Sequence, residues 1–163
     1  MEKFTGKVWL LGDDIDTDII MPTEYLVFKT IEEMKPYAFS PLRPELAAQI
    51  RPGDIIVAGS NFGCGSSREQ APEVVKALGL RCVIAKSFAR IFFRNAINNG
   101  LLLIENADLA DFVKEGEEIT VTVNEKIECR GKEFPIVSLP DNLVEIINAG
   151  GLVKDMRKRN GLD

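Results

Sequence analysis

The sequence contains no histidine and only three cysteines among its 163 residues. Without histidine, the chain alone cannot perform Ser-His-Asp or Cys-His catalysis, and it lacks the commonest protein ligand for transition metals. Cys64, Cys82 and Cys129 are odd in number and form no C-x-x-C pair. This spacing encodes neither a disulfide framework nor a complete zinc or iron–sulfur site, so we expect this chain itself to bind no metal.

Long apolar runs and an excess of positive charge are also missing. No apolar stretch approaches the roughly 20 residues that a membrane span needs. Residues 1–6 lack the apolar core of a signal peptide, so we expect a cytoplasmic protein without a membrane segment. The formal net charge of −5 argues against a nucleic-acid partner. A basic cluster at 154–159 is typical of a solvated helix end.

Length and composition are typical of one globular domain over residues 1–163. Hydrophobic residues make up 45% and charged residues 28% of the chain, which is long enough to bury a substantial core. Short β-branched apolar runs predict strands, and apolar residues at helical spacing predict helices. The predicted strands are 8–11, 55–58, 82–85, 101–104, 119–123 and 134–137, and the predicted helices are 45–50, 73–78, 87–99, 108–113 and 142–148.

The order of these elements predicts an α/β fold. From residue 55 the chain alternates strand, glycine-rich loop, helix, strand, helix and strand, which favours a parallel sheet. The segment 119–134 instead predicts an antiparallel ribbon. Residues 29–44, with three prolines, are expected to form a long irregular connection.

Particular residues are expected to mark helix ends. Ser87 can cap the start of helix 87–99, and Gly100 can end it. Pro140 and Asp141 suit a helix start, and the following Gly150-Gly151 pair suits a stop.

The most informative motif is the glycine-rich run at 59–69, which reads Gly-Ser-Asn-Phe-Gly-Cys-Gly-Ser-Ser-Arg-Glu. Its glycines permit tight turns and leave backbone N–H groups accessible, and a helix N-terminus favours an anion. We therefore expect the run to bind a carboxylate or a phosphate. It is not a Walker A motif, because no Lys-Ser/Thr pair follows the glycines, and Arg68 stands where a dinucleotide fingerprint has its third glycine.

The alternative for this run is a tight turn in which serines cap the next helix. Pro72 weakens that alternative, because a proline is tolerated only near the start of a helix and the helix should begin no earlier than about Arg68. Ser66 and Ser67 would then precede the helix with their hydroxyls free, so we favour a functional loop.

An acidic cluster follows the first predicted strand. The spacing Asp14-x-Asp16-x-Asp18 resembles a calcium loop, but Ile19 and Tyr25 occupy the glycine and bidentate-glutamate positions, so calcium is not expected. Two interpretations remain. The cluster is either a loop rich in Asx turns or a set of carboxylates that orients a catalytic group beside the glycine-rich run.

A third motif, at 86–95, combines an aromatic stripe with two arginines. The aromatic stripe is interpreted as core packing. Arg90 and Arg94 lie one helical turn apart and share a polar face, which would meet either an anion or solvent.

Taken in order, these motifs resemble the small subunits of the aconitase-type hydro-lyases, and among them those of 3-isopropylmalate dehydratase. The resemblance runs through 16–22, 25–28, 59–69 and 87–92 and covers nearly the whole chain. It implies a swivelling β/β/α domain with a central mostly parallel sheet, flanking helices and an additional antiparallel β portion. It also implies a large subunit that carries a [4Fe–4S] cluster and whose active site this chain completes.

The resemblance further implies a reaction and residue roles. The reaction is the interconversion of 2-isopropylmalate and 3-isopropylmalate, by loss and return of water, in leucine biosynthesis. Ser66 corresponds to the family's base, acting as an alkoxide, and Asp18 to an aspartate that pairs with a histidine of the large subunit. Ser67 and Arg68 correspond to residues that hold a substrate carboxylate.

Substrate choice in this family is implied to lie in the loop Tyr25-Leu26-Val27-Phe28. Homoaconitase relatives place an arginine there to bind an extra carboxylate, whereas Val27 and Phe28 offer apolar surface that suits an isopropyl group. Two alternatives remain open. One is a homoaconitase or broad-specificity small subunit of lysine or 2-oxoacid elongation pathways, and the other is a non-catalytic carboxylate-binding module.

Overall fold

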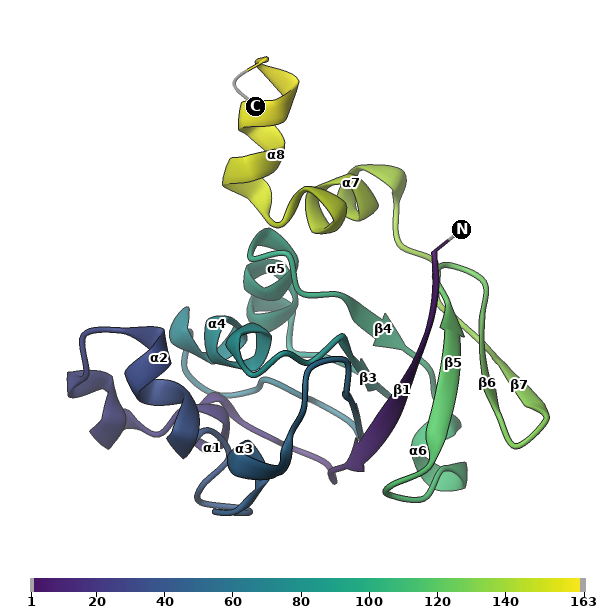
Figure 1. Ribbon diagram of the computed structural model, residues 1–163, viewed down its shortest axis with the longest axis horizontal. Helices are drawn as coiled ribbons and strands as arrows, with labels where there is room; N and C mark the ends of the chain where they lie inside the picture. The colour runs from purple at the N-terminus through teal and green to yellow at the C-terminus, as the bar shows by residue number, and fades with distance from the viewer. Residues whose placement is uncertain (1, 162–163) are drawn as a thin grey trace.

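The computed structural model describes residues 2–161, which form one curled sheet of seven strands in the order β4-β3-β2-β1-β5-β6-β7, with helices around it (Figure 1). The strands are β1 (Lys3–Leu10), β2 (Ile55–Ala58), β3 (Cys82–Ala85), β4 (Leu103–Glu105), β5 (Glu118–Thr122), β6 (Lys126–Cys129) and β7 (Lys132–Pro135). The α-helices are α1 (Thr17–Ile20), α2 (Ile31–Met34), α3 (Leu46–Gln49), α4 (Gln70–Ala77), α5 (Arg90–Asn98), α6 (Leu109–Phe112), α7 (Asp141–Ala149) and α8 (Leu152–Arg159). Two 3-10 helices, η1 (Thr23–Val27) and η2 (Lys35–Tyr37), complete the set.

Strand β1 belongs to both parts of the sheet. Its second half pairs in parallel with β2, and its first half pairs antiparallel with β5. The parallel part continues through β3 and β4, and the antiparallel part through β6 and β7. Gly6 precedes the change of partner, and a Cβ there would lie 2.4 Å from the carbonyl oxygen of Gly53, so the close approach requires glycine. The predicted α/β fold, with its central parallel strands and antiparallel addition, is confirmed.

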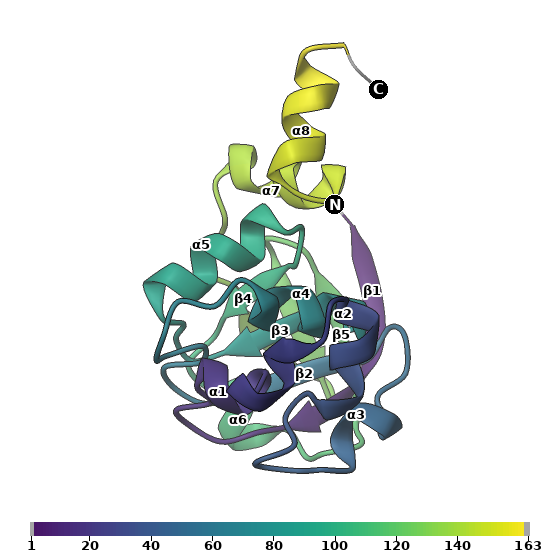
Figure 2. The ribbon, with the colours of Figure 1, turned by 90° about the vertical axis from the view of Figure 1, so that its left-hand side faces the viewer.

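Two apolar cores lie on opposite faces of the parallel strands, because successive side chains of a strand point to opposite sides. Ile56 and Ala58 face the core beneath α1–α5, whereas Ile55 and Val57 face the core formed with β5–β7 and α6. Figure 2 shows α1, α2, α4 and α5 on the near side of the sheet. Every residue of β2 and β3 is buried, which explains their continuous apolar sequence.

Between residues 2 and 161, no helix has the length and apolarity to cross a membrane.

Most predicted elements are confirmed with shifted ends. Strands β2 and β3 match their predicted bounds, and α4 begins at Gln70, within the limit that Pro72 sets. Pro140 is the N-cap of α7, and Gly150 ends that helix in the left-handed conformation with φ +94°. Both of these helix ends agree with the sequence.

The predicted cap at Ser87 is wrong. Helix α5 begins at Arg90 after Ala89, which provides no side-chain cap. Ser87 instead accepts a hydrogen bond at its Oγ from the backbone N–H of Asn61, at 2.8 Å. A parallel bridge between Phe62 and Phe88 keeps the segment before α5 extended. Because of this tertiary contact, the helix begins three residues after Ser87.

The prediction of an irregular connection at 29–44 is wrong in part, because the segment contains α2 and η2. Thr30 caps α2: its Oγ1 accepts a hydrogen bond from the N–H of Glu33 at 3.2 Å and donates one to the Glu33 carboxylate at 3.0 Å. This Thr-x-x-Glu spacing is a capping box, a helix signal that was present in the sequence.

Candidate active site

The candidate site lies at the carboxyl ends of β1, β2 and β3, where the loops 11–16, 59–69 and 86–89 meet beside the start of α1. This edge of a parallel sheet is where ligands ordinarily bind in open α/β folds. Backbone hydrogen bonds join the loops, and they run from Thr17 N to the Cys64 carbonyl (2.8 Å), from Asp14 N to the Ser60 carbonyl (2.8 Å) and from Ala89 N to the Phe62 carbonyl (2.9 Å). The glycine-rich loop is therefore fixed from both sides.

Two aspartates of the acidic cluster serve loop structure. Asp13 Oδ1 accepts a hydrogen bond from the N–H of Ser60 at 2.7 Å, and Asp16 caps α1 by accepting from the N–H of Ile19 at 2.8 Å. Gly59 makes room for the first of these contacts, since a Cβ there would lie 1.8 Å from Asp13 Oδ1. Asp16 makes the local side-chain-to-backbone contact that the Asx-turn interpretation expects, whereas Asp13 joins two loops that are 47 residues apart in the chain.

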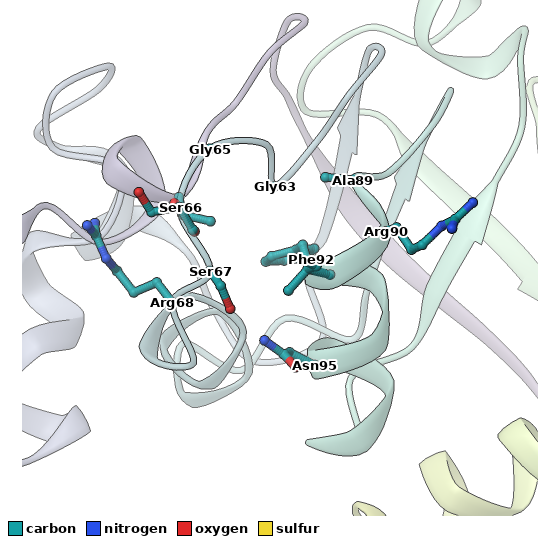
Figure 3. Close-up of a pocket in the computed structure, with 11 residues that line it drawn as sticks. Gly63, Gly65, Ser66, Ser67, Arg68, Ala89, Arg90, Phe92 and Asn95 are labelled. Carbon is teal, nitrogen blue, oxygen red and sulfur yellow. The ribbon is translucent and has the colours of Figure 1, made fainter.

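A cavity of about 220 Å³ opens between the glycine-rich loop and the first turns of α5 (Figure 3). Residues 63 and 65–68 form one wall, Thr17 lies with them, and residues 89–92 and 95 form the other wall. Ser66 and Ser67 are exposed there, and neither hydroxyl has a hydrogen-bond partner within residues 2–161. The expectation that both hydroxyls stand free before α4 is confirmed.

The backbone of Ser66 is held in place although its side chain is free. The Thr17 hydroxyl donates a hydrogen bond to the Ser66 carbonyl at 2.8 Å, and Thr17 is only 3% exposed. The preceding Gly65 has φ +93°, a conformation that favours glycine. A rigid backbone with a free hydroxyl is suited to presenting a reactive oxygen to a ligand.

Arg68 is held against α1 and η1. Its Nη1 donates to the Met21 carbonyl at 2.9 Å and to Asp18 Oδ1 at 3.3 Å, and its Nη2 donates to Thr23 Oγ1 at 3.1 Å. In Figure 3 the Arg68 guanidinium points away from Asn95, whereas the Ser67 hydroxyl points toward it. The structure therefore brings Asp18 and Arg68 together and places the Ser67 hydroxyl on the other side of the loop.

Asp18 accepts all of its hydrogen bonds at one oxygen. Oδ1 accepts from the N–H and the hydroxyl of Thr23, at 3.1 and 2.9 Å, as well as from Arg68. The hydrogen bonds from Thr23, and then the one from Arg68, hold the pKa of Asp18 below its ordinary value. The side chain is 63% exposed, and Oδ2 makes no hydrogen bond with the described residues, so it is open to an outside donor.

The prediction of a loop at 25–28 is wrong in part, because residues 25–27 belong to the 3-10 helix η1, and the segment lies outside the cavity lining. Tyr25 stacks on Tyr37 with ring centroids 4.2 Å apart, and Phe28 stacks on Tyr37 at 5.7 Å, so both rings are tied to η2. Leu26 is also half-buried, whereas Val27 is 79% exposed. Val27 and Phe28 were expected to offer apolar surface. The side chain of Val27 is the more exposed of the two.

The first turn of α5 lines the cavity, and the free N–H groups at a helix start favour an anion there. Arg90, Ile91 and Phe92 line the cavity, and their N–H groups have no acceptor within the described chain. Gly63 brings the loop close to this turn, because a Cβ there would lie 2.2 Å from Phe92 Cγ. Ile91, Asn95 and Thr17 are lining residues that sequence reasoning did not single out.

Residues 2–161 contain no group of three or more His, Cys, Asp or Glu side chains arranged to hold a metal ion. Cys82 and Cys129 are buried in β3 and β6, and burial raises the pKa of both thiols. Burial, and then the nearby Asp16 and Asp14, raise the pKa of Cys64. This donor set does not fit an iron–sulfur cluster, which is ordinarily held by several thiolates.

Known proteins resemble this chain along nearly its full length. A family model described as the aconitase C-terminal domain matches residues 32–109. The chain is 80% identical over 162 residues, 99% of each chain, to the 3-isopropylmalate dehydratase small subunit of Lachnospira eligens. It is 49% identical over 160 residues to small subunit 1 of Archaeoglobus fulgidus, covering 94% of this chain and 99% of that one.

Two further comparisons involve Methanocaldococcus jannaschii. The chain is 45% identical, over 94% of each chain, to a protein named isopropylmalate/citramalate isomerase small subunit. A crystal structure of 3-isopropylmalate dehydratase from the same organism aligns with a TM-score of 0.92 and 40% identity, covering 98% of this chain and 96% of that one.

Proposed function

Because the chain belongs to the small subunits of 3-isopropylmalate dehydratase, within the aconitase family, we propose that it completes the active site of a large subunit. The complex would interconvert 2-isopropylmalate and 3-isopropylmalate by removing water and returning it at the neighbouring carbon. The [4Fe–4S] cluster, and the Lewis acidity it would supply, are placed on the large subunit in this proposal.

One observation carries the proposal. The cavity presents two unpaired serine hydroxyls and the first turn of a helix, while none of its described lining residues is a carboxylate, a histidine or a cysteine. Such a wall can bind an anionic substrate and offer an oxygen base, but it lacks the remaining groups that a hydro-lyase needs. It therefore fits half of a shared site.

Ser66 is assigned the role of base. A serine hydroxyl becomes basic only when nearby dipoles and cations stabilise its anion. The N–H groups around Gly65 and the Arg68 guanidinium, which points toward α1 like the Ser66 hydroxyl in Figure 3, can provide that stabilisation. The alkoxide would remove the weakly acidic proton next to a substrate carboxylate.

Asp18 is assigned a positioning role at the subunit boundary. It already holds Arg68 through Oδ1, and its exposed Oδ2 is available to a histidine N–H from the large subunit. Ionised Asp18 would thereby link the partner to the arginine beside the base.

The direct test is reconstitution with a large subunit. The chain is expressed with the large subunit of a relative, the cluster is loaded, and turnover of 2-isopropylmalate, citramalate and homoaconitate is compared. We expect turnover only by the complex, with isopropylmalate favoured over homoaconitate. Preference for homoaconitate would overturn the substrate assignment. Dicarboxylate binding by the chain alone, with no partner and no turnover, would favour the non-catalytic module.

A broad-specificity dehydratase is the second candidate. The relative from M. jannaschii is named for both isopropylmalate and citramalate. Val27 is largely exposed, so within the described chain its side chain is not enclosed in an apolar pocket. Equal turnover of citramalate and isopropylmalate would support this candidate over the first.

Replacing Val27 by arginine tests the role of the loop. We expect kcat/KM for homoaconitate, relative to isopropylmalate, to rise about tenfold or more, because a guanidinium can pair with the additional carboxylate. Val27→Met is the matched control, since it lengthens the side chain without adding charge. An unchanged substrate ratio in the arginine variant would show that Val27 lies away from the substrate.

A further inference from the structure

Asn95 presents an unpaired amide to the cavity from the wall opposite the glycine-rich loop. It lies on α5 and lines the cavity, and its side chain points toward Ser67 in Figure 3. Its only hydrogen bond in the described chain beyond the helix ladder is at its backbone carbonyl, which accepts from Asn99 Nδ2 at 2.8 Å. Asn95 is half-buried, and its NH2 group keeps both of its donors for another acceptor.

The hydrogen-bond donors around the cavity fall into two regions. On the α1 side, the Arg68 guanidinium already donates to three acceptors, at Asp18, Met21 and Thr23. On the α5 side, the Ser67 hydroxyl and the Asn95 amide face each other and are both unpaired. Arg68 keeps two of its five N–H donors, but its guanidinium and the Ser67 hydroxyl point to opposite sides of the loop, so we expect them to hold different carboxylates.

A malate-type substrate carries two carboxylates, which matches two regions of donors. We propose that Asn95 and Ser67 bind one substrate carboxylate between them, on the α5 side of the cavity, while the other carboxylate lies toward Arg68. The first-turn N–H groups of α5 add positive potential on the same side. This inference rests on the proposed function, and it adds a binding residue on a helix that sequence reasoning treated mainly as core.

Charge substitution at Asn95 tests the proposal in the reconstituted complex. Asn95→Asp places a negative charge against the bound carboxylate, so we expect KM for isopropylmalate to rise tenfold or more at pH 8, with kcat changed less. As pH falls toward 5, protonation of the new carboxyl should return KM toward the wild-type value. Asn95→Ala should raise KM several-fold with no new pH dependence.

The matched control is Asn98→Asp, which adds the same charge on α5 but outside the cavity lining. It should leave KM and its pH profile unchanged. A purely structural role for Asn95 would change stability without a pH-dependent KM, so thermal unfolding of every variant is measured alongside. If Asn95→Asp and Asn95→Ala both keep KM within twofold, the inference is overturned.

Equilibrium binding separates this inference from the proposed function. The stabilisation of each complex by 2-isopropylmalate in thermal unfolding measures binding without turnover. A wild-type complex that is stabilised but inactive, with binding lost in Asn95→Asp, would overturn the proposed reaction and support the site. An active wild-type complex with equal stabilisation of all variants would overturn the site and leave the reaction standing.

Discussion

Substitution of Ser66 by alanine is expected to lower kcat for isopropylmalate about 10³-fold, the usual range for loss of a positioned base. The Ser66 hydroxyl is exposed and unpaired in the described chain, so its removal leaves no buried polar group without a partner. The Thr17 hydrogen bond to the Ser66 carbonyl is retained, because it involves only the backbone of Ser66. Steady-state kinetics of the reconstituted complex measure the effect.

Ser67→Ala is the matched control for that experiment. It removes a neighbouring hydroxyl of the same kind, and the carboxylate-binding role predicts a higher KM rather than a collapse of kcat. Gel filtration should show that both variants still associate with the large subunit. A Ser66→Ala complex that keeps a tenth or more of wild-type kcat would show that another group is the base.

Replacement of Gly63 by alanine is expected to destabilise the fold by about 2–5 kcal/mol. Gly63 has φ +84°, and an alanine in a left-handed conformation costs about 1–2 kcal/mol. The added Cβ would also meet Phe92 Cγ at 2.2 Å, and overpacking of this kind costs about 1–3 kcal/mol more. Urea unfolding of the isolated chain measures the change in the free energy of unfolding.

Gly116→Ala separates the two contributions. Gly116 has a similar φ of +91°, but a Cβ there would have nothing within 4 Å, so only the backbone cost of about 1–2 kcal/mol applies. If Gly63→Ala and Gly116→Ala destabilise the fold equally, the glycine-rich loop can shift enough to avoid the contact between the new Cβ and Phe92. The cavity wall would then be less rigid than the contact indicates.

The sequence predicted those elements whose pattern is local. Strands β2 and β3 are buried on both faces, so their apolar runs begin and end with the strands. The start of α5 was missed because the Phe62–Phe88 bridge, between residues far apart in the chain, extends the segment before it. Helix α2 was missed, although its capping box is visible in the sequence. Thr30 is the residue just before the helix, and Glu33 is in its first turn.

The sequence indicated a candidate site, but it did not indicate in which directions the side chains of that site point. The glycine-rich run and the acidic cluster lie together at one edge of the sheet, as the sequence indicated. Whether Arg68 turns toward Asp18 or toward α5 depends on hydrogen bonds across 45–50 residues of chain, which no local pattern encodes. Asn95 resembled an ordinary polar position of an amphipathic helix. The large subunit and its cluster remain predictions from the resemblance.

The sharing of β1 between both parts of the sheet has a consequence for biogenesis. As the chain leaves the ribosome, the second half of β1 can pair once β2 emerges, but its first half waits for β5, more than 50 residues later. Until β5 is made, the backbone N–H and C=O groups on one edge of β1 have no partner strand. Unpaired strand edges of this kind promote aggregation. Ribosome-bound chains that end before residue 118 should therefore depend on chaperones more than the finished chain does.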